Sequence, residues 1–445
     1  MESVYKGPIL PTVWAMLKRI LIAAVWVMVA FNATYLTVRI ARDRDLFPSK
    51  GVDSGASRFR EAVELIRENY AGGPEVAAGE LTDKALVEMM KSLDPHSEYL
   101  TRKRFDTVQN DLRGEFGGIG VQIELKNNRV TVIAPIAGTP GERAGILRGD
   151  QIIKVNGQEI EDPPLNKAIE KLRGRPGTTV GVTLHRPATG ADIDVKITRE
   201  IIRQDTIRTA QILEPGIGYI HLTQFNERSG VEFREALGRL EREGMRALVL
   251  DLRNNPGGLL NVAVEVAQPF FDRGELVVYT QGRTASSRQD YNAQGDSERR
   301  DYPIAVIVNS GSASASEVVT GALRDTNRAV VIGERTFGKG SVQTILPLKN
   351  GDALRLTTAR YFTPGGRVIH EVGIAPDIEL PVSVEEEGKL IVQRLRRDYE
   401  DAAEFKERFG FDPVEDKQLR AATDMLRGVL AMAPARQAAI ASAAQ

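Results

Sequence analysis

The chain of 445 residues is longer than a single hydrophobic core usually supports, so its length predicts two or three domains. Its 59 basic and 60 acidic residues leave a net charge of −1, so the chain lacks the electrostatic footprint of a nucleic-acid-binding protein. The absence of cysteine excludes disulfides, thiolate catalysis and cysteine-ligated metals, and it suits any redox compartment.

The first predicted element is a membrane-spanning helix at residues 20–38, which contain no charged side chain. At about 1.5 Å per residue, a helix of this length just crosses a hydrocarbon core of roughly 30 Å. The segment is longer than the apolar part of a usual signal peptide and lacks an Ala-x-Ala site, which favours a retained anchor over a cleaved signal. A buried core helix is the alternative. Equal numbers of basic residues flank the segment, so the charges do not decide its orientation.

Residues 1–50 are therefore interpreted as a tail, a transmembrane anchor and a linker, and residues 51–112 as a small helical region. Phe59, Val63 and Ile66 recur at helical spacing at the start of that region. This spacing predicts a helix that packs through its apolar stripe.

Residues 113–200 predict an independent β-rich domain, because short β-type runs alternate there with turn dipeptides. Residues 121–125 alternate between apolar and polar side chains, and Asn156-Gly157 is a strong hairpin signal.

This β-rich segment resembles a PDZ domain. The resemblance is carried by Gly117-Gly118-Ile119-Gly120, Ala144-Gly145-Ile146-Leu147-Arg148-Gly149-Asp150-Gln151-Ile152 and Val155-Asn156-Gly157. It implies a binding site for a peptide's terminal carboxylate, formed by the backbone N–H groups of Gly117, Gly118, Ile119, Gly120 and Val121. A dinucleotide-binding loop is excluded because Ile123 occupies the third glycine position and no helix follows. A purely structural β-domain remains the alternative.

Residues 201–382 predict an α/β domain, because strands and amphipathic helices alternate along them. The predicted strands are 218–222, 247–252 and 304–308, and the predicted helices are 229–242, 259–271 and 317–324. Two unusual turns follow the second and third strands: one contains Gly257-Gly258, and the other is rich in serine. Both turns are therefore expected at the carboxyl ends of strands, where such sheets usually place their sites.

The serine-rich turn and a later lysine suggest a Ser-Lys hydrolase, because a serine needs a base to become a nucleophile. Ser314 precedes a predicted helix, and Lys339 lies 25 residues after Ser314. If Ser314 attacks a substrate carbonyl, the oxyanion that forms on the carbonyl oxygen would face the N–H of Ala315 and one N–H from Gly257 or Gly258. Glycine at both positions permits the close backbone approach that this arrangement requires, although a plain strand-to-helix turn is the alternative.

Lys339 can act as a base only if its pKa lies far below the usual value of about 10.4. Lowering it toward neutrality costs roughly 3 kcal/mol, which desolvation can supply. Gln343 follows Lys339 by four residues and can orient the amine by a hydrogen bond without adding a charge that would raise its pKa.

Three motifs in this domain resemble those of the C-terminal processing peptidases, also called tail-specific proteases. They are Asp251-Leu252-Arg253-Asn254-Asn255-Pro256-Gly257-Gly258, Gly311-Ser312-Ala313-Ser314-Ala315-Ser316-Glu317 and Gly333-Glu334-Arg335-Thr336-Phe337-Gly338-Lys339-Gly340-Ser341-Val342-Gln343. Residues 93–97 and 373–377 agree as well, so the resemblance covers about residues 57–382. It implies Ser314 as the nucleophile, Lys339 as the general base and Gln343 as its orienting residue, with turn or capping roles for the other serines.

The same resemblance implies further features. Arg173 corresponds to an arginine through which the PDZ domain of some members senses occupancy, and Asp325 to an acid near the site, for which a helix-end role is favoured. Cleavage would act on proteins with exposed apolar C-termini, on the periplasmic side of the inner membrane, from a single-pass anchor. A homo-oligomer and an adaptor protein are the further partners considered.

Other functions are weaker interpretations. Residues 333–339 fill the first seven places of a phosphate-binding P-loop, but Gly340 stands where serine or threonine should hold magnesium, and a strand follows. A catalytically silent PDZ adaptor and an acyl-CoA enzyme are the remaining alternatives. The four histidines form no pair with metal-ligand spacing and no obvious Ser-His-Asp triad, so no metal or cofactor is predicted.

Residues 383–445 predict a helical extension that ends in an alanine-rich stretch. Disorder, dimerisation and partner binding remain open for it. The predicted fold is a multidomain α+β chain with an N-terminal membrane helix, a small helical region, a PDZ β-domain, an α/β Ser-Lys peptidase core and this C-terminal helical tail.

Overall fold

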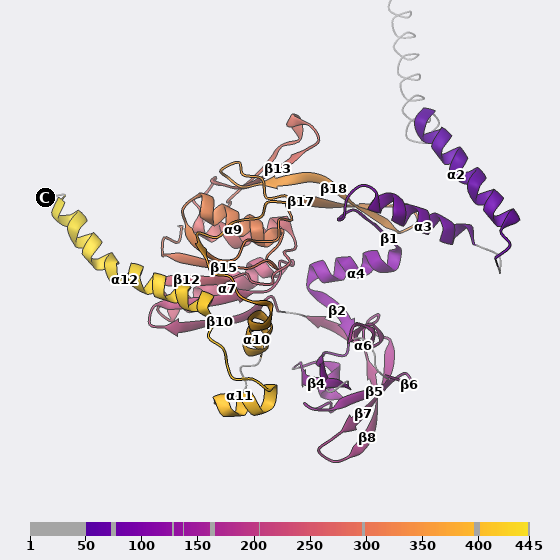
Figure 1. Cartoon of the computed structure of the whole chain (residues 1–445), viewed down its shortest axis with the longest axis horizontal. Coiled ribbons are helices and arrows are strands. Elements are labelled where there is room, and N and C mark those ends of the chain that lie inside the picture. Colours follow the sequence, from indigo (N-terminus) through magenta and orange to yellow (C-terminus); the bar gives the residue numbers. More distant parts are fainter. Residues whose placement is uncertain are drawn as a thin grey trace, which may run out of the picture. The chain divides into compact units, whose positions relative to one another are not determined.

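The computed structural model describes residues 50–72, 77–126, 129–136, 138–160, 165–203, 205–295, 299–395 and 401–443 (Figure 1). The membrane span predicted at residues 20–38 lies outside these residues. Among the helices that the structure describes, none is both long and apolar enough to cross a membrane. The chain divides into two compact units, residues 1–88 and 89–445.

The helical region predicted after the linker is present. Its helices are α2 (Lys50–Asn69), α3 (Ala78–Lys91) and α4 (Arg102–Arg113), with the short strand β1 (Glu98–Leu100) between the last two. Phe59 and Ile66 of α2 are 41% and 42% exposed, so the packing predicted for this apolar stripe is not seen in the described part of the chain.

The β-rich domain is built around a sheet with the strand order β3-β4-β5-β7-β8, and β6 pairs with β5. Its elements are β3 (Val121–Lys126), β4 (Arg129–Pro135), α5 (Pro140–Arg143), β5 (Gln151–Val155), β6 (Gln158–Glu159), α6 (Leu165–Leu172), β7 (Thr179–Arg186) and β8 (Ala191–Thr198). Separately from this sheet, β2 (Glu115–Gly118) pairs antiparallel with β9 (Glu200–Arg203). The domain has its own apolar core, and Ile119 before β3 belongs to it.

The α/β domain contains a six-stranded sheet with the order β10-β11-β12-β15-β16-β19. The strands are β10 (Ile207–Glu214), β11 (Ile217–Leu222), β12 (Ala247–Asp251), β15 (Ile304–Val308), β16 (Ala329–Gly333) and β19 (Ile378–Glu379). Every pair except β10 with β11 is parallel. The predicted strand and helix rhythm is therefore confirmed, and the turns after β12 and β15 lie at the same edge of the sheet.

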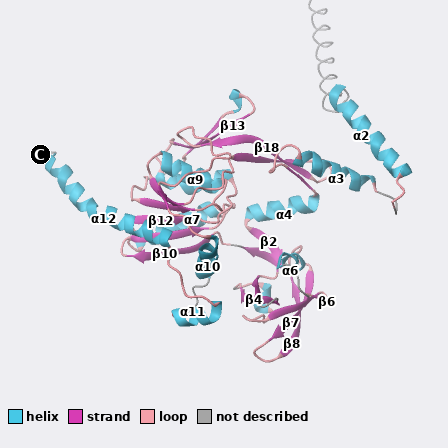
Figure 2. Ribbon diagram, viewed as in Figure 1, coloured by secondary structure: helices cyan, strands magenta, loops and turns pink. Residues whose placement is uncertain are grey.

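Helices cover both faces of this sheet (Figure 2). On one face, the apolar core joins the sheet to α7 (Ser229–Arg242), α8 (Leu260–Ala267) with its 3₁₀ turn η1 (Gln268–Phe270), and α9 (Ala315–Asp325). On the other face, Ala422 and Leu426 of α12 (Lys417–Ala443) pack against Val249 and Ile307. This part of α12 is therefore a structural cover of the sheet, a role that was not among those considered for the C-terminal extension.

A second sheet lies beside the catalytic motifs and has the order β1-β18-β13-β14, with β17 on the other edge of β18. Its remaining elements are β13 (Leu276–Gly282), η2 (Ala285–Ser287), β14 (Gln289–Asn292), β17 (Ser341–Pro347) and β18 (Ala353–Phe362). This sheet brings β1 and β17, which are more than two hundred residues apart, onto neighbouring positions around β18.

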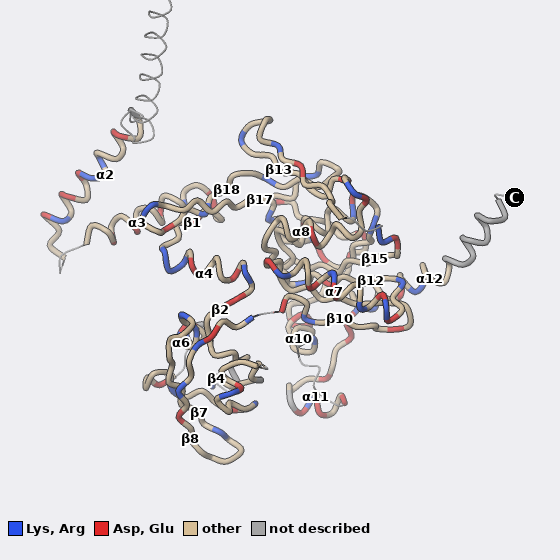
Figure 3. The backbone as a smooth tube through the Cα atoms, turned by 180° about the vertical axis from the view of Figure 1, so that it is seen from behind, with Lys and Arg blue, Asp and Glu red and all other residues tan. Residues whose placement is uncertain are grey.

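The C-terminal extension begins with α10 (Val384–Leu395) and α11 (Ala402–Phe409), before α12. Basic and acidic residues are interspersed along the described chain, in keeping with its near-zero net charge (Figure 3).

Candidate active site

Ser314 lies at the start of α9 in a backbone conformation that residues other than glycine rarely adopt. Its φ is 55° and its ψ is −113°, and only 7% of the residue is exposed. A non-glycine residue with positive φ is uncommon and costs free energy, so the surrounding contacts must hold it in place. The strand-turn-helix context therefore presents a single strained serine next to the N-terminus of α9.

The other serines of the turn have different environments. Ser312 and Ser316 are fully buried, and their hydroxyls donate to the carbonyls of Leu252 and Asn255 at 2.8 and 2.9 Å. Ser310 is exposed. Ser312 and Ser316 therefore connect the serine-rich turn to the turn that follows β12. Because their hydroxyls are used in this way and Ser310 is exposed, Ser314 is the candidate nucleophile.

The glycine pair after β12 packs directly against the Ser314 turn. A Cβ added to Gly257 would lie 2.5 Å from the carbonyl oxygen of Ala313 and 2.8 Å from the Cβ of Ser314, so no side chain fits there. The N–H of Gly257 donates to Asn255 Oδ1 at 2.9 Å. The N–H groups of Gly258 and Ala315 have no acceptor among the described residues. Gly258 and Ala315 are therefore the pair suited to an oxyanion hole, and Gly257 serves the close approach.

A buried carboxylate joins the Ser314 turn to the Lys339 loop. Glu317 is fully buried and accepts hydrogen bonds from the N–H groups of Ser314, Gly338 and Lys339 at 2.8, 2.7 and 2.8 Å. The hydroxyl of Thr336 donates to the same carboxylate at 2.6 Å. Burial raises the pKa of Glu317, and these four hydrogen bonds oppose that shift. One side chain thus fixes the spacing of two loops, and the sequence motifs alone did not reveal this role.

The environment of Lys339 has the property that a lysine base requires. Burial, followed by the positive charge of Arg355, lowers the pKa of Lys339, and the charge of Glu317 opposes the change. The predicted cause, desolvation, is therefore the main one. The P-loop interpretation is not supported, because β17 rather than a helix follows Gly340.

Gln343 lies on β17 opposite Thr357 of β18. Its Nε2 donates to Thr357 Oγ1 at 2.8 Å and to Ser341 Oγ at 3.2 Å. Its Oε1 is buried and has no hydrogen-bond partner in the described structure. The amide oxygen is therefore available for a further donor.

Two neighbours of the site were missed or undervalued in the sequence. The N–H of Tyr361 on β18 donates to the carbonyl of Gly340, next to Lys339, at 2.7 Å, and burial raises the pKa of Tyr361 to about 12. Burial, followed by the charge of Lys339, lowers the pKa of His96. No spacing signal marks either residue, because both reach the site through the second sheet.

The C-terminal extension contacts the turn after β12. Arg253 is almost fully buried, and its guanidinium donates to Asp251 of the same turn and to both carboxylate oxygens of Asp416, at 2.8 and 2.9 Å. Next to it, Glu387 of α10 accepts a hydrogen bond from Asn254 at 2.7 Å. Extension residues thus hold the segment that leads into the glycine pair.

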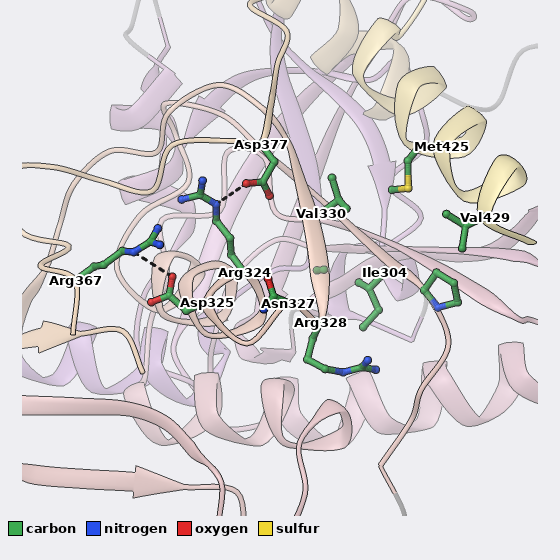
Figure 4. Close-up of a pocket in the computed structure, with 12 residues that line it drawn as sticks. Ile304, Arg324, Asp325, Asn327, Arg328, Val330, Arg367, Asp377, Met425 and Val429 are labelled. Atoms are coloured by element: carbon green, nitrogen blue, oxygen red, sulfur yellow. Dashed lines mark hydrogen bonds and ion pairs between the residues drawn. The ribbon is translucent and has the colours of Figure 1, made fainter. Parts of the chain in front are cut away.

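Asp325 lies at the opposite end of α9 from Ser314, about 16 Å along the helix axis. It pairs with Arg367 at 3.5 Å, and Arg324 pairs with Asp377 at 2.7 Å, in the wall of a cavity of about 640 Å³ (Figure 4). The helix-end role favoured for Asp325 agrees with this position. This cavity contains none of the predicted catalytic residues.

The groove of the β-rich domain has a volume of about 640 Å³ and is lined by Gly118, Ile119, Gly120, Val121, Ile123, Ile133, Ile136, Ile169, Leu172 and Arg173, among others. The N–H groups of Ile119 and Gly120 have no acceptor among the described residues. A Cβ on Gly117 or Gly120 would meet Gly174 or Thr139 within 2.3 Å, so these glycines serve internal packing as well. The guanidinium of Arg173 lies over the Phe116 ring, 4.4 Å from its centroid.

No group of three or more His, Asp or Glu side chains suited to a metal ion occurs in the described ranges.

Comparisons with known proteins agree with this architecture. Residues 216–380 match the model of peptidase family S41, and residues 117–197 match that of the PDZ domain. The carboxy-terminal-processing protease of Bartonella bacilliformis is 38% identical over 84% of this chain and 88% of its own length. The carboxy-terminal processing protease CtpA of Bacillus subtilis is 35% identical over 79% of this chain and 76% of its own length.

A solved structure of a photosystem II D1 C-terminal processing protease is 32% identical, covers 74% of this chain and 94% of that one, and has a TM-score of 0.44. The chain belongs to peptidase family S41, as a PDZ-containing serine peptidase related to the carboxy-terminal processing proteases.

Proposed function

We propose that this chain is a membrane-anchored endopeptidase that captures unfolded protein C-termini in its PDZ groove and cleaves them with a Ser-Lys dyad. Ser314 is the nucleophile, Lys339 the general base and Gln343 its orienting residue. The observation that carries this proposal is the Glu317 carboxylate, which binds the backbone N–H groups of Ser314 and Lys339 at the same time.

The dyad supplies each proton transfer of peptide hydrolysis. The neutral amine of Lys339 takes the proton of Ser314 as Oγ attacks the substrate carbonyl, and the N–H groups of Gly258 and Ala315 stabilise the oxyanion. When the C–N bond breaks, the ammonium of Lys339 gives that proton to the leaving amine. The neutral amine of Lys339 then takes a proton from the water that attacks the acyl-enzyme ester, and the resulting ammonium gives this proton to Ser314 Oγ as the ester C–O bond breaks.

The PDZ groove accounts for the choice of substrate. The N–H groups of Ile119 and Gly120 are free to bind a terminal carboxylate, and the apolar walls favour an apolar last residue. Strand β3 lies at the edge of its sheet, so an extended tail can pair with it. Arg173 lines this groove and contacts Phe116 of β2, which makes it the residue proposed to report occupancy.

Location is proposed from the sequence. Residues 20–38 would anchor the chain in the inner membrane, with the catalytic part on the periplasmic side. Cell fractionation and accessibility of the full-length protein to added protease in spheroplasts test this placement.

The dyad is tested on the full chain with a permanently unfolded reporter protein that ends in alanine, valine and leucine. We expect Ser314→Ala and Lys339→Met to lower kcat by roughly 10⁴-fold or more. The exposed Ser310 and Lys349 provide the matched controls Ser310→Ala and Lys349→Met, which should retain turnover. A Lys339→Met variant that cleaves as fast as wild type would exclude Lys339 as the base.

A further inference from the structure

Arg199 is a buried cation of the β-rich domain, and its hydrogen-bond acceptors are all neutral. Only 7% of the residue is exposed. Its Nε and Nη2 donate to the carbonyls of Leu172 and Lys171, both at 2.9 Å, and its Nη1 donates to Thr178 Oγ1 at 3.0 Å and to the carbonyl of Thr179 at 3.4 Å. Buried arginines are normally paired with an acid, but Arg199 forms no ion pair within the part of the chain that the structure describes.

Two of these acceptors are carbonyl groups at the C-terminal end of α6, the helix that forms one wall of the PDZ groove. The last carbonyls of a helix have no partner within the helix, and together they carry about half a negative charge. An anionic peptide end near them would be repelled. Because the guanidinium of Arg199 covers both carbonyls with a full positive charge, the surroundings of this helix end are net positive.

Backbone contacts hold this charge next to the loop that is proposed to bind the carboxylate. A Cβ added to Gly174 would lie 2.8 Å from Arg199 Nε, so the guanidinium lies directly on this glycine. The N–H of Gly174 donates to the carbonyl of Gly117, the first residue of the loop, at 3.1 Å. Glu200, which follows Arg199, pairs with Gly118 in the ladder of β2 and β9. Arg199 is therefore held beside the first two residues of the loop by two independent contacts.

The arginines that line the groove cavity itself differ from Arg199 in their exposure. Arg173, Arg203 and Arg208 all line the cavity and are exposed, and Arg203 also pairs with Glu115 at 3.4 Å. Salt screens exposed charges strongly and buried charges much less. The field of Arg199 at the groove should therefore persist at salt concentrations that suppress the field of the other three.

We propose that the buried charge of Arg199 gives the PDZ groove its preference for a free terminal carboxylate over an uncharged peptide end. The N–H groups of the loop can bind a neutral amide oxygen as well as a carboxylate, whereas the guanidinium favours the anion. The inference rests on the proposed capture of C-termini. It assigns the recognition of the terminal charge to Arg199 and leaves the choice of the last side chain to the apolar walls.

The first test compares two labelled peptides that end in alanine, valine and leucine, one with a free C-terminus and one amidated. Their binding is measured on the full chain carrying Ser314→Ala, so that neither peptide is cleaved. An opposite charge about 10 Å away, in an effective dielectric of about 20, changes binding roughly tenfold. We therefore expect Arg199→Gln to lower the ratio of the two affinities about tenfold, whatever it does to both peptides alike.

Arg203→Gln is the matched control, because it removes an exposed arginine of the same groove. We expect this variant to change the affinity ratio less than about twofold. An unchanged ratio in Arg199→Gln would overturn the inference while leaving the proposed capture of C-termini intact. If wild type binds the two peptides equally, the proposed capture itself fails, and the inference fails with it.

The second test separates the charge of Arg199 from its hydrogen bonds. Arg199→Lys keeps the charge but loses the planar group that binds both carbonyls of α6. We expect a lower thermal unfolding midpoint, together with an affinity ratio close to that of wild type. If Arg199→Lys loses the ratio as fully as Arg199→Gln, Arg199 acts by holding α6 in place, and the inference is wrong.

A measurement on the Ser314→Ala chain with Arg199 intact keeps the inference testable if both Arg199 variants fold poorly. Between about 0.1 and 1 M sodium chloride, we expect the affinity ratio to stay within about twofold, because a buried charge is weakly screened. A ratio that falls toward one as salt rises would assign the preference to the exposed arginines of the groove and would contradict the proposal.

Discussion

The PDZ groove and the peptidase site are built from different chemical groups. The groove offers free N–H groups of two adjacent residues, Ile119 and Gly120, above apolar side chains. The peptidase site consists of polar side chains from segments far apart in the chain, held by buried carboxylates such as Glu317 and Asp251. The proposed substrate capture therefore depends on a local loop, whereas the proposed catalysis depends on long-range contacts. Changes in the groove should alter KM, and changes in the carboxylates should alter kcat and stability.

Among the residues that hold the two sites in place, the largest effect is expected at Glu317, whose carboxylate accepts four hydrogen bonds. Glu317→Gln keeps the shape but turns one acceptor into a donor that faces N–H groups. We expect kcat to fall roughly a thousandfold, because the spacing of Ser314 and Lys339 changes. We also expect a loss of about 3 kcal/mol in the free energy of unfolding, measured by urea titration. Glu371→Gln, in the same region but with an exposed carboxylate, is the control. Wild-type turnover by Glu317→Gln would show that the hydrogen bonds of Glu317 do not determine the spacing of Ser314 and Lys339.

The second effect concerns the buried pair that joins the C-terminal extension to the turn after β12. Asp416→Ala leaves the guanidinium of Arg253 short of a partner in a buried position. We expect a loss of roughly 3 kcal/mol in the free energy of unfolding, and a smaller fall in kcat. Asp412→Ala removes an exposed ion pair with Lys406 from the same extension and should cost less than about 1 kcal/mol. Equal losses in the two variants would mean that the extension does not support the turn.

The same contrast explains what the sequence could predict. Local patterns identified the PDZ loop, the strand and helix alternation, and the turns that carry Ser314 and Lys339, because each depends on residues close together in the chain. The choice of Gly258 over Gly257 as a free N–H depends on the side chain of Asn255, which no spacing reveals. The positions of Tyr361 and Asp416 beside these turns depend on sheet pairing and on packing of the extension.

In the PDZ groove, the expected change is confined to substrate capture. Ile169→Asp puts a carboxylate into the apolar wall near the bound tail, where it is poorly solvated and repels the terminal carboxylate. We expect KM for the tailed reporter to rise about tenfold or more, with kcat at saturation unchanged. Leu147→Asp is the surface control, because Leu147 is 52% exposed and lies outside the groove lining. A fall in saturating kcat would show that the groove and the peptidase site are not separable in this way.

The smallest expected effect is a change in pH dependence at the peptidase site. Arg355 is the second cause, after burial, of the lowered pKa of Lys339. Arg355→Gln removes a positive charge, which favours the ammonium form and raises the pKa of Lys339. In the proposed mechanism only the neutral amine accepts the proton of Ser314, so the acidic limb of the kcat/KM profile should move to higher pH. We expect a loss of about threefold in rate on that limb and no change on the alkaline plateau. Arg355→Lys keeps the charge and should keep the wild-type profile. A uniform loss at every pH would instead mean that Arg355 supports the fold through its ion pair with Glu98.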